Sequence, residues 1–417
     1  MRIAHVIHGH PARSMGGTGL YVHALAHALA TVGHDVAVAS PESNGRTRLI
    51  ERDGGVEHWS IGTDRVRAWS DTWNGSVATW VDWCAEWRPD VVHIHHLSGW
   101  PLSLIEHTPC RTVLTLHDYA IPCARGQLLT AQLALCDGPN ATACTRCLGP
   151  ALRTHPVLHA IGHWVARAPR LYRLARQLAS RAGSEADHPG VAARLEAAKR
   201  AISAADHLLA PSRDLAERIV RLGFAKPSHT DLPLLHPPLP VPSTPTERAS
   251  GPVRFLFASS ILPTKGVDRL VACFERLSEN ATLTIAGHAP PFDGRPGFGA
   301  SVRARAMALP NVTWVGAVES DAVPRLMREH DVLVLPSIWP ENSPLVVREA
   351  TASGLRIIGP RLGGCAELAP DATLVGTEEE LFSALVAESR ARHPRAKPRS
   401  WPSPQDHASV LLRTAYR

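Results

Sequence analysis

The sequence predicts an α/β protein made of two doubly wound, Rossmann-like domains in tandem, with a cleft between them. Two observations lead to this prediction. Short apolar runs alternate with helical patterns over most of the 417 residues, and this alternation is typical of parallel sheets covered by helices. A proline-rich stretch over 236–252 then separates two such series, as expected of an extended linker.

The first series predicts a domain over 1–235. A helical pattern covers Leu20–Ala30 and ends at Gly33, as helices often do. Ligands of such sheets bind at the carboxyl ends of the strands. The strands expected here are Arg2–Ile7, Asp35–Ala39, Asp90–His95, Thr112–Leu116 and Asp206–Leu209.

The second series predicts a domain over 253–400, followed by a C-terminal segment over 401–417 that we interpret as packing back on the first domain. Its helices are expected at Val267–Leu277, Asp321–Glu329, Pro344–Ser353 and Glu378–Ser389. Its strands are expected at Val253–Ala258, Thr282–Ala286, Val312–Val315, Asp331–Leu335, Arg356–Ile358 and Thr373–Val375.

Composition excludes several classes of protein. With 44% hydrophobic and 20% charged residues, the chain is globular rather than disordered. No apolar run approaches the roughly 18 residues of a membrane span. A net charge of +6 suits an anionic substrate or membrane surface and is too small to indicate nucleic acid. The absence of a secretory pattern at the start predicts a cytoplasmic location, peripheral on the inner membrane face if it contacts lipid.

The most informative segment lies between Asp331 and Leu368. A buried strand is followed by Glu341, and Ser343-Pro344 then predicts a helix with Ser343 as N-cap and proline in the first turn. The amides of Leu345 and Val346 would lie unpaired at the positive end of this helix, where they favour an anion. Glu349 follows on the same helix, and Gly363-Gly364 opens the next loop.

A lysine precedes this segment at the corresponding strand end. Lys265-Gly266 follows the first strand of the second domain, and a lysine at the carboxyl edge of a parallel sheet is placed to neutralise phosphate. Considered singly, a residue such as Lys265 or Glu349 is more often an ordinary surface residue. Their combination is what favours a nucleotide site.

Together these residues resemble the retaining GT-B glycosyltransferases of family 4, and the resemblance covers nearly the whole chain. The motifs that carry it are Lys265-Gly266, Glu341-x7-Glu349, Gly363-Gly364 with Glu367, Gly16-Gly17 and Leu116-His117-Asp118. The resemblance implies that Lys265 holds the diphosphate of a nucleotide sugar, that Glu341 contacts the donor sugar and that Glu349 binds the ribose hydroxyls. Ser343, the amides of Leu345 and Val346, and the Gly363-Gly364 loop would complete the donor site.

One position departs from the family pattern. The family often has an arginine five residues before the lysine as a second diphosphate clamp, and here that position is Ser260. Ser260 is included in the donor site on this basis. Arg361, in the loop before Gly363, is one substitute for the missing cation.

In the first domain, Gly16-Gly17 would allow close backbone approach to a phosphate or sugar. His117 and Asp118 directly follow a strand, so they should point into the ligand-binding edge of the sheet. The resemblance implies a catalytic role for His117 near the reacting sugar and an acceptor-side role for Asp118. The alternative for His117 is a hydrogen bond to backbone at the strand end.

Two further features carry weaker interpretations. Trp80, Trp83 and Trp87 have helical spacing and are expected to pack as one helix face. The basic stretch over 151–184 holds six arginines and no acid. It is interpreted either as a solvated helix or as a contact to an anionic membrane or lipid carrier.

Four of the eight cysteines form a cluster within the insertion at about 120–150. Cys123, Cys136, Cys144 and Cys147 have the spacing C-x12-C-x7-C-x2-C, and a C-x2-C pair with two further thiols can complete a tetrahedral zinc site. The interpretation is a structural zinc, with free thiols or disulfides as alternatives. Catalysis itself requires no cofactor, because Lys265 and helix termini serve the diphosphate.

The function expected is transfer of a sugar from a nucleoside-diphosphate sugar to a hydroxyl of a glycan or lipid-linked saccharide, with retention at the anomeric carbon. Biosynthesis of a lipopolysaccharide or exopolysaccharide would use such an enzyme. A nucleotide-sugar epimerase of the same fold and a non-catalytic sugar-nucleotide-binding protein are the alternatives. No nucleic-acid partner is expected.

Overall fold

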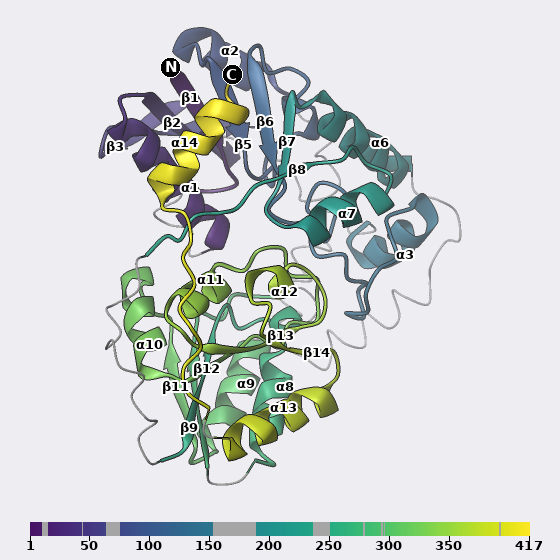
Figure 1. Ribbon diagram of the computed structural model, residues 1–417. Helices are drawn as coiled ribbons and strands as arrows, with labels where there is room; N and C mark the ends of the chain where they lie inside the picture. Colours follow the sequence, from purple (N-terminus) through teal and green to yellow (C-terminus); the bar gives the residue numbers. More distant parts are fainter. Residues whose placement is uncertain are drawn as a thin grey trace. The chain divides into compact units, whose positions relative to one another are not determined.

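The computed structural model describes residues 1–10, 16–43, 45–63, 76–152, 189–236, 251–277, 280–292, 295, 297–391 and 393–417. The chain forms two compact units. Unit 1 contains residues 1–233 and 402–417, and unit 2 contains residues 234–401. Each unit is a sheet covered by helices (Figure 1), so the predicted fold class is confirmed.

Unit 1 contains an eight-stranded sheet with the strand order β3-β4-β2-β1-β5-β6-β7-β8. Apart from the antiparallel pair β3 and β4, its neighbouring strands are parallel. The strands are β1 (Arg2–Val6), β2 (Asp35–Ser43), β3 (Arg48–Asp53), β4 (Val56–Thr63), β5 (Val91–Ile94), β6 (Arg111–Thr115), β7 (His207–Ala210) and β8 (Ser228–His229).

The described helices of unit 1 include the last helix of the chain. They are α1 (Gly17–Thr31), α2 (Ala78–Trp87), the 3-10 helix η2 (Leu102–Leu104), α3 (Ala141–Leu152), α6 (Pro189–Ala204), α7 (Arg213–Arg221) and α14 (Pro404–Thr414). The C-terminal helix α14 lies against α1 (Figure 1). Hydrogen bonds join the C-terminal segment to the rest of unit 1, among them those between Tyr21 and His407, between His93 and Tyr416, and from Arg111 to the Ala415 carbonyl oxygen.

Unit 2 contains a six-stranded parallel sheet with the order β11-β10-β9-β12-β13-β14. Its strands are β9 (Val253–Ala258), β10 (Ala281–Ala286), β11 (Val312–Gly316), β12 (Val332–Val334), β13 (Arg356–Pro360) and β14 (Thr373–Val375). Its described helices are η3 (Pro263–Lys265), α8 (Val267–Phe274), α9 (Phe298–Met307), η4 (Ser320–Ala322), α10 (Val323–Glu329), α11 (Leu345–Ala352), α12 (Cys365–Leu368) and α13 (Glu378–Arg390).

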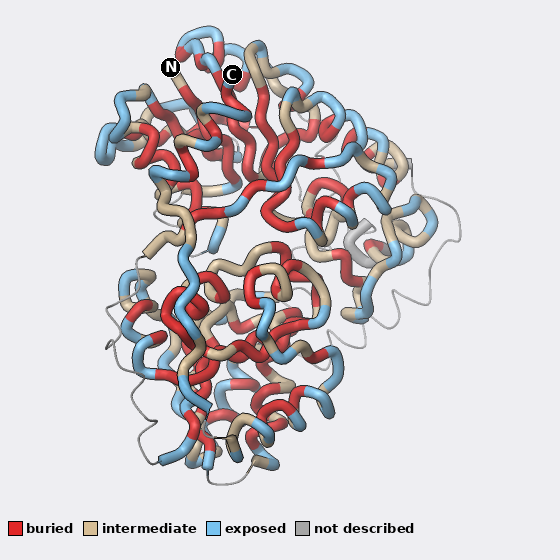
Figure 2. Tube along the Cα trace, in the orientation of Figure 1, coloured by how far each residue is buried: buried red, intermediate tan, exposed pale blue. Residues whose placement is uncertain are grey.

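The central strands of both sheets are buried on both faces, which explains why they read as continuous apolar runs. β12 reads VLV and is buried throughout, and β5 reads VVHI and is also buried throughout. Figure 2 shows these strands as part of the buried interior of their units. Their carboxyl ends therefore sit on a rigid base, which fixes the direction of the side chains that follow them.

The tryptophan helix and one edge of the unit 1 sheet differ in how they compare with the sequence-based predictions. Trp80, Trp83 and Trp87 are at most 6% exposed, and neighbouring rings in the series stack, which confirms the packed helix face. The wholly parallel sheet predicted for the first domain is wrong at one edge. β3 pairs antiparallel with β4 because Gly54 and Gly55, both at positive φ, form a tight turn between them.

The basic stretch over 151–184 lies outside the described residues apart from the end of α3, and so does most of the predicted linker. Within the described ranges, no helix is both long and apolar enough to cross a membrane.

Candidate functional site

The Lys265–Glu341 ion pair is the centre of the candidate site in unit 2. Lys265 Nζ donates to Glu341 Oε1 at 2.6 Å. The side chain of Lys265 is 17% exposed and that of Glu341 only 4%, so water screens this pair weakly. The structure therefore brings together the two residues that the sequence predicted as phosphate clamp and sugar contact.

Two residues that the sequence analysis did not single out also donate to Glu341. Ser337 Oγ and Trp339 Nε1 reach the same Oε1 atom at 2.5 and 2.9 Å. Lys265 Nζ also lies 5.1 Å from the centroid of the Trp339 ring, within cation–π range. The sequence signal for Ser337 and Trp339 was their position between the end of β12 and Glu341.

The backbone holds this ion pair in place through close approaches at two glycines. Gly266 has φ +69, and a Cβ there would lie 2.0 Å from the carbonyl oxygen of Pro336. Gly363 has φ +87, and a Cβ there would lie 2.1 Å from the carbonyl oxygen of Glu341. Only glycine fits such positions. The Lys265 turn and the Gly363 loop therefore both pack against the segment that carries Glu341.

The Gly363-Gly364 loop also hydrogen-bonds to Glu341. The amide of Gly364 donates to the Glu341 carbonyl oxygen at 2.6 Å, and Glu341 and Gly363 form an isolated parallel bridge. The loop thus meets the glutamate through main-chain atoms. This contact fixes the Glu341 backbone independently of its side chain.

The prediction that Ser343 is the N-cap of the next helix is wrong. The helix α11 begins at Leu345, with Pro344 in the cap position and no side-chain cap. Ser343 Oγ instead accepts from Nε and Nη2 of Arg348, at 3.3 and 3.1 Å. Arg348 is fully buried. A buried guanidinium requires hydrogen-bond acceptors, because leaving its N–H groups unpaired away from water is costly. The amides at the helix start can instead bind other groups.

Leu345 and Val346 occupy the first two positions of α11, where the amides have no partner within the helix. Glu349 lies one turn further on. Burial raises the pKa of Glu349 to about 8, so its carboxyl carries a proton at neutral pH in this state. A carboxyl group of this kind can both donate to and accept from hydroxyl groups.

Ser260, which stands where the family often has arginine, and Arg361, the suggested substitute, both lie in the described part of unit 2. Ser260 lies in the loop after β9, and its carbonyl oxygen accepts from the amide of Leu262 at 2.9 Å. Arg361 donates to Glu380 Oε1 at 2.8 Å, and Glu380 belongs to the capping box of α13. Arg361 is therefore engaged by a neighbouring helix in this state.

A pocket of about 660 Å³ lies near the carboxyl ends of β10 and β11. Its lining includes Gly287, His288, Arg303, Trp314 and Gly316. The sequence analysis did not single out these residues, because no motif marks them. The Trp314 indole and the Arg303 guanidinium in this lining are groups that can contact a planar ring.

The candidate residues of unit 1 lie at two strand–helix junctions. Gly17 is the first residue of α1 and Gly16 is its N-cap. His117 and Asp118 follow β6, as expected. Asp118 Oδ2 lies 3.0 Å from His96 Nε2. Burial opposes its charge, but His96 and the Ala120 amide outweigh burial and lower the pKa of Asp118.

His117 is hydrogen-bonded to a second histidine. Its Nε2 lies 3.2 Å from His95 Nδ1, and burial lowers the pKa of His117 to about 3. His95 is in turn bonded to His5. His93 lies in the buried strand β5, and His95 and His96 directly follow it. This group of histidines was a signal that the sequence analysis did not use.

The four clustered cysteines come from a loop and one helix of unit 1, and their thiols are free. Cys123 and Cys136 lie in the loop that follows β6, and α3 carries Cys144 and Cys147. Burial raises the pKa of Cys144 to about 11, and the thiols of the other three act in the same direction. The four groups therefore lie near one another.

Among the described residues, three groups bring metal-ligand atoms within 4.8 Å of one another, and the thiols are not one of these. Arg194 of α6 is 3% exposed beside them, and its Nη2 donates to the Ala120 carbonyl oxygen at 2.7 Å. Its Nε and Nη1 are buried and find no hydrogen-bond partner within the described part of the chain.

Family models match both units of the chain. The model described as Glycosyltransferase Family 4 matches residues 15–230, and the model described as Glycosyl transferases group 1 matches residues 252–388. A curated relative is the D-inositol 3-phosphate glycosyltransferase of Xylanimonas cellulosilytica, 31% identical over 201 residues. This match covers 43% of the present chain and 46% of the relative, so the chain spans about half the length of that protein.

Solved structures show the same fold at low identity. Sucrose-phosphate synthase from Thermosynechococcus elongatus has a TM-score of 0.62 at 17% identity, over 100% of this chain and 95% of that one. Anabaena Alr3699/HepE in complex with UDP-glucose has a TM-score of 0.59 at 14% identity, over 100% and 95%. Since the family model alone covers more than half of the chain, this protein belongs to glycosyltransferase family 4.

Proposed function

We propose that this protein transfers a sugar from a nucleoside-diphosphate sugar to a hydroxyl group, with retention at the anomeric carbon. The observation that carries the proposal is the shielded pair of Lys265 and Glu341 at the carboxyl edge of the unit 2 sheet. The acceptor would be a glycan or a lipid-linked saccharide. The complex of Anabaena Alr3699/HepE with UDP-glucose supports a nucleotide-sugar donor for this fold.

The arrangement suits departure of a diphosphate. Lys265 would bind the diphosphate and stabilise the negative charge that develops as the bond to the sugar breaks. The sugar carbon becomes positively charged in the same step, and the Glu341 carboxylate would favour that charge. The helix start at Leu345 and Val346 would bind further donor oxygens, and Glu349 would bind the ribose hydroxyls.

The first experiment identifies the donor. Thermal-shift titration with UDP-, GDP-, ADP- and TDP-sugars should raise Tm for the correct donor, because ligands that bind the folded state stabilise it by mass action. Proton NMR of the product then reads the anomeric configuration. An inverted product would refute the retaining mechanism, and sugar conversion without acceptor would indicate an epimerase.

A matched variant tests the role of Glu341. Glu341→Gln keeps the size of the side chain and removes its charge, so turnover at saturating donor should fall by roughly 10²-fold while donor binding persists. Glu379→Gln alters an exposed carboxylate on α13 and serves as control. Normal turnover in the Glu341 variant would refute this assignment.

We further propose that Cys123, Cys136, Cys144 and Cys147 bind one structural zinc. Four thiolates are the donor set that zinc prefers, and the buried guanidinium of Arg194 would offset part of their negative charge. Zinc binding would require the cysteine side chains to rotate toward a common point. The role is structural because the predicted transfer chemistry needs no open metal position.

A further inference from the structure

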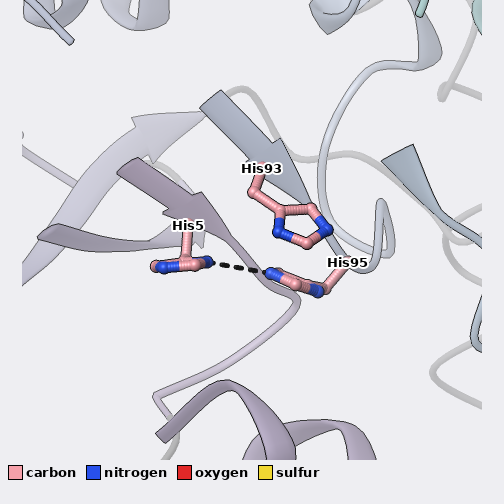
Figure 3. Close-up of side chains that lie close together, drawn as sticks. All are labelled: His5, His93 and His95. Carbon is pink, nitrogen blue, oxygen red and sulfur yellow. Dashed lines mark hydrogen bonds between the residues drawn. The ribbon is translucent and has the colours of Figure 1, made fainter. Parts of the chain in front are cut away.

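Three histidines form a continuous hydrogen-bonded chain that includes the candidate residue His117. His5 lies on β1, and His95 follows directly after β5, the strand paired beside it. His5 Nδ1 lies 2.9 Å from His95 Nε2, the bond drawn in Figure 3. His95 Nδ1 lies 3.2 Å from His117 Nε2. The chain therefore uses both ring nitrogens of His95.

Only two proton arrangements satisfy such a chain when the imidazoles are neutral. Each neutral ring has one N–H and one bare nitrogen. His5 is fully buried and His95 is 2% exposed, which disfavours their charged forms. Either all three rings carry the proton on Nδ1, or all three carry it on Nε2. The choice at one end therefore fixes the choice at the other.

The His5 end decides between the two arrangements. His5 Nε2 is buried and has no hydrogen-bond partner among the residues that the structure describes. A proton on this atom would leave a buried N–H donor without an acceptor, which folded proteins rarely tolerate. A proton on Nδ1 instead makes the bond to His95 and leaves only a lone pair at Nε2. The arrangement with the proton on Nδ1 of each ring is therefore favoured.

We propose that His5 and His95 are positioning residues that hold His117 in the tautomer with its proton on Nδ1. His117 then offers an N–H donor, and it does not act as a general base through that nitrogen. The group it would serve is an oxygen of a substrate sugar, a role that rests on the proposed transferase function. The tautomer itself does not depend on that function.

The neighbouring His93 does not make this cluster a metal site. Ligand atoms of His5, His93 and His95 lie within 4.8 Å of one another. However, the two nitrogens of His93 are bonded to the Tyr416 hydroxyl at 2.6 Å and the Thr115 hydroxyl at 2.7 Å. Those of His95 are bonded to His5 and His117. A metal ion would have to break several of these bonds.

The direct test is a two-bond proton–nitrogen NMR spectrum of the full chain with ¹⁵N-labelled histidine rings, with His117→Ala used to assign the His117 signals. We expect a protonated Nδ1 and a bare Nε2 at His117. A protonated Nε2 would overturn the proposal. Because this spectrum needs no substrate, it remains decisive even if the protein transfers no sugar.

A matched pair of variants tests the consequence for catalysis. The amide of His5→Asn can still donate to His95, whereas the carboxylate of His5→Asp only accepts and should reverse the chain. We expect turnover of His5→Asp to fall about tenfold below His5→Asn, with similar KM for the donor and a proton moved to Nε2 of His117. Equal turnover and equal tautomers in the two variants would refute the positioning role.

Discussion

The ammonium of Lys265 lies 2.6 Å from the carboxylate of Glu341, although the two residues are 76 positions apart in sequence. Two parallel strands of unit 2 bring them together, because Lys265 follows β9 and Glu341 follows its neighbour β12. Both side chains are largely shielded from water. Removing one charge therefore leaves the other poorly compensated.

Lys265→Met tests this pair. The variant keeps most of the side-chain volume and removes the charge, so donor affinity measured by calorimetry should fall roughly 10- to 100-fold. The free energy of unfolding should also fall, by about 3 kcal/mol. Arg325→Met is the control, because Arg325 forms an ion pair with Glu329 at an exposed position and should change little. Unchanged donor affinity in Lys265→Met would contradict the phosphate role.

Glu349 should make stability depend on pH. Its pKa is raised to about 8 in the folded protein, against about 4.3 when exposed. Between these values the folded state binds a proton that the unfolded state lacks, so the stability contributed by Glu349 is lost as pH rises through this window. Urea unfolding at pH 5 and pH 9 should show a fall that Glu349→Gln reduces by at least 1.4 kcal/mol. An identical pH dependence in both proteins would refute the raised pKa.

Gly363→Ala should damage the fold through a clash as well as backbone strain. Gly33 has the same φ of +87 with nothing within 4 Å of an added Cβ, whereas at Gly363 that Cβ would meet the Glu341 backbone. Gly33→Ala should thus cost about 1–2 kcal/mol from backbone strain alone. Gly363→Ala should cost more and should also lower turnover. Equal losses of stability in denaturant unfolding would show that the loop can move away from Glu341.

Zinc content tests the cysteine cluster. Elemental analysis of purified protein should find about one zinc per chain, and Cys144→Ser should lose it together with several degrees of Tm. Cys110→Ser, at a cysteine outside the cluster, should keep both. Protein that contains no zinc but shows fewer than eight free thiols would indicate disulfides instead. Eight free thiols with no zinc would return the cluster to unliganded cysteines.

The apolar runs and their spacing determined the two sheets and most of their strands, because buried parallel strands must be apolar on both faces. The segment from Asp331 to Leu368 likewise placed Glu341 and Gly363-Gly364 at strand ends. The β3–β4 hairpin was missed, although Gly54-Gly55 is a recognisable turn signal. It was overlooked because β3 is a largely exposed edge strand without a strong apolar pattern.

Tertiary structure decided which partner each polar side chain found. Ser343 has the residue type and position expected of an N-cap, but its hydroxyl accepts a hydrogen bond from the buried guanidinium of Arg348. Arg361 was a candidate phosphate clamp, but Glu380 in the first turn of α13 pairs with it. The bond between His5 and His95 joins β1 to the residue after β5, 90 positions away in sequence. Local sequence sets backbone preferences, whereas hydrogen-bond partners are chosen among all groups that folding brings within about 3 Å.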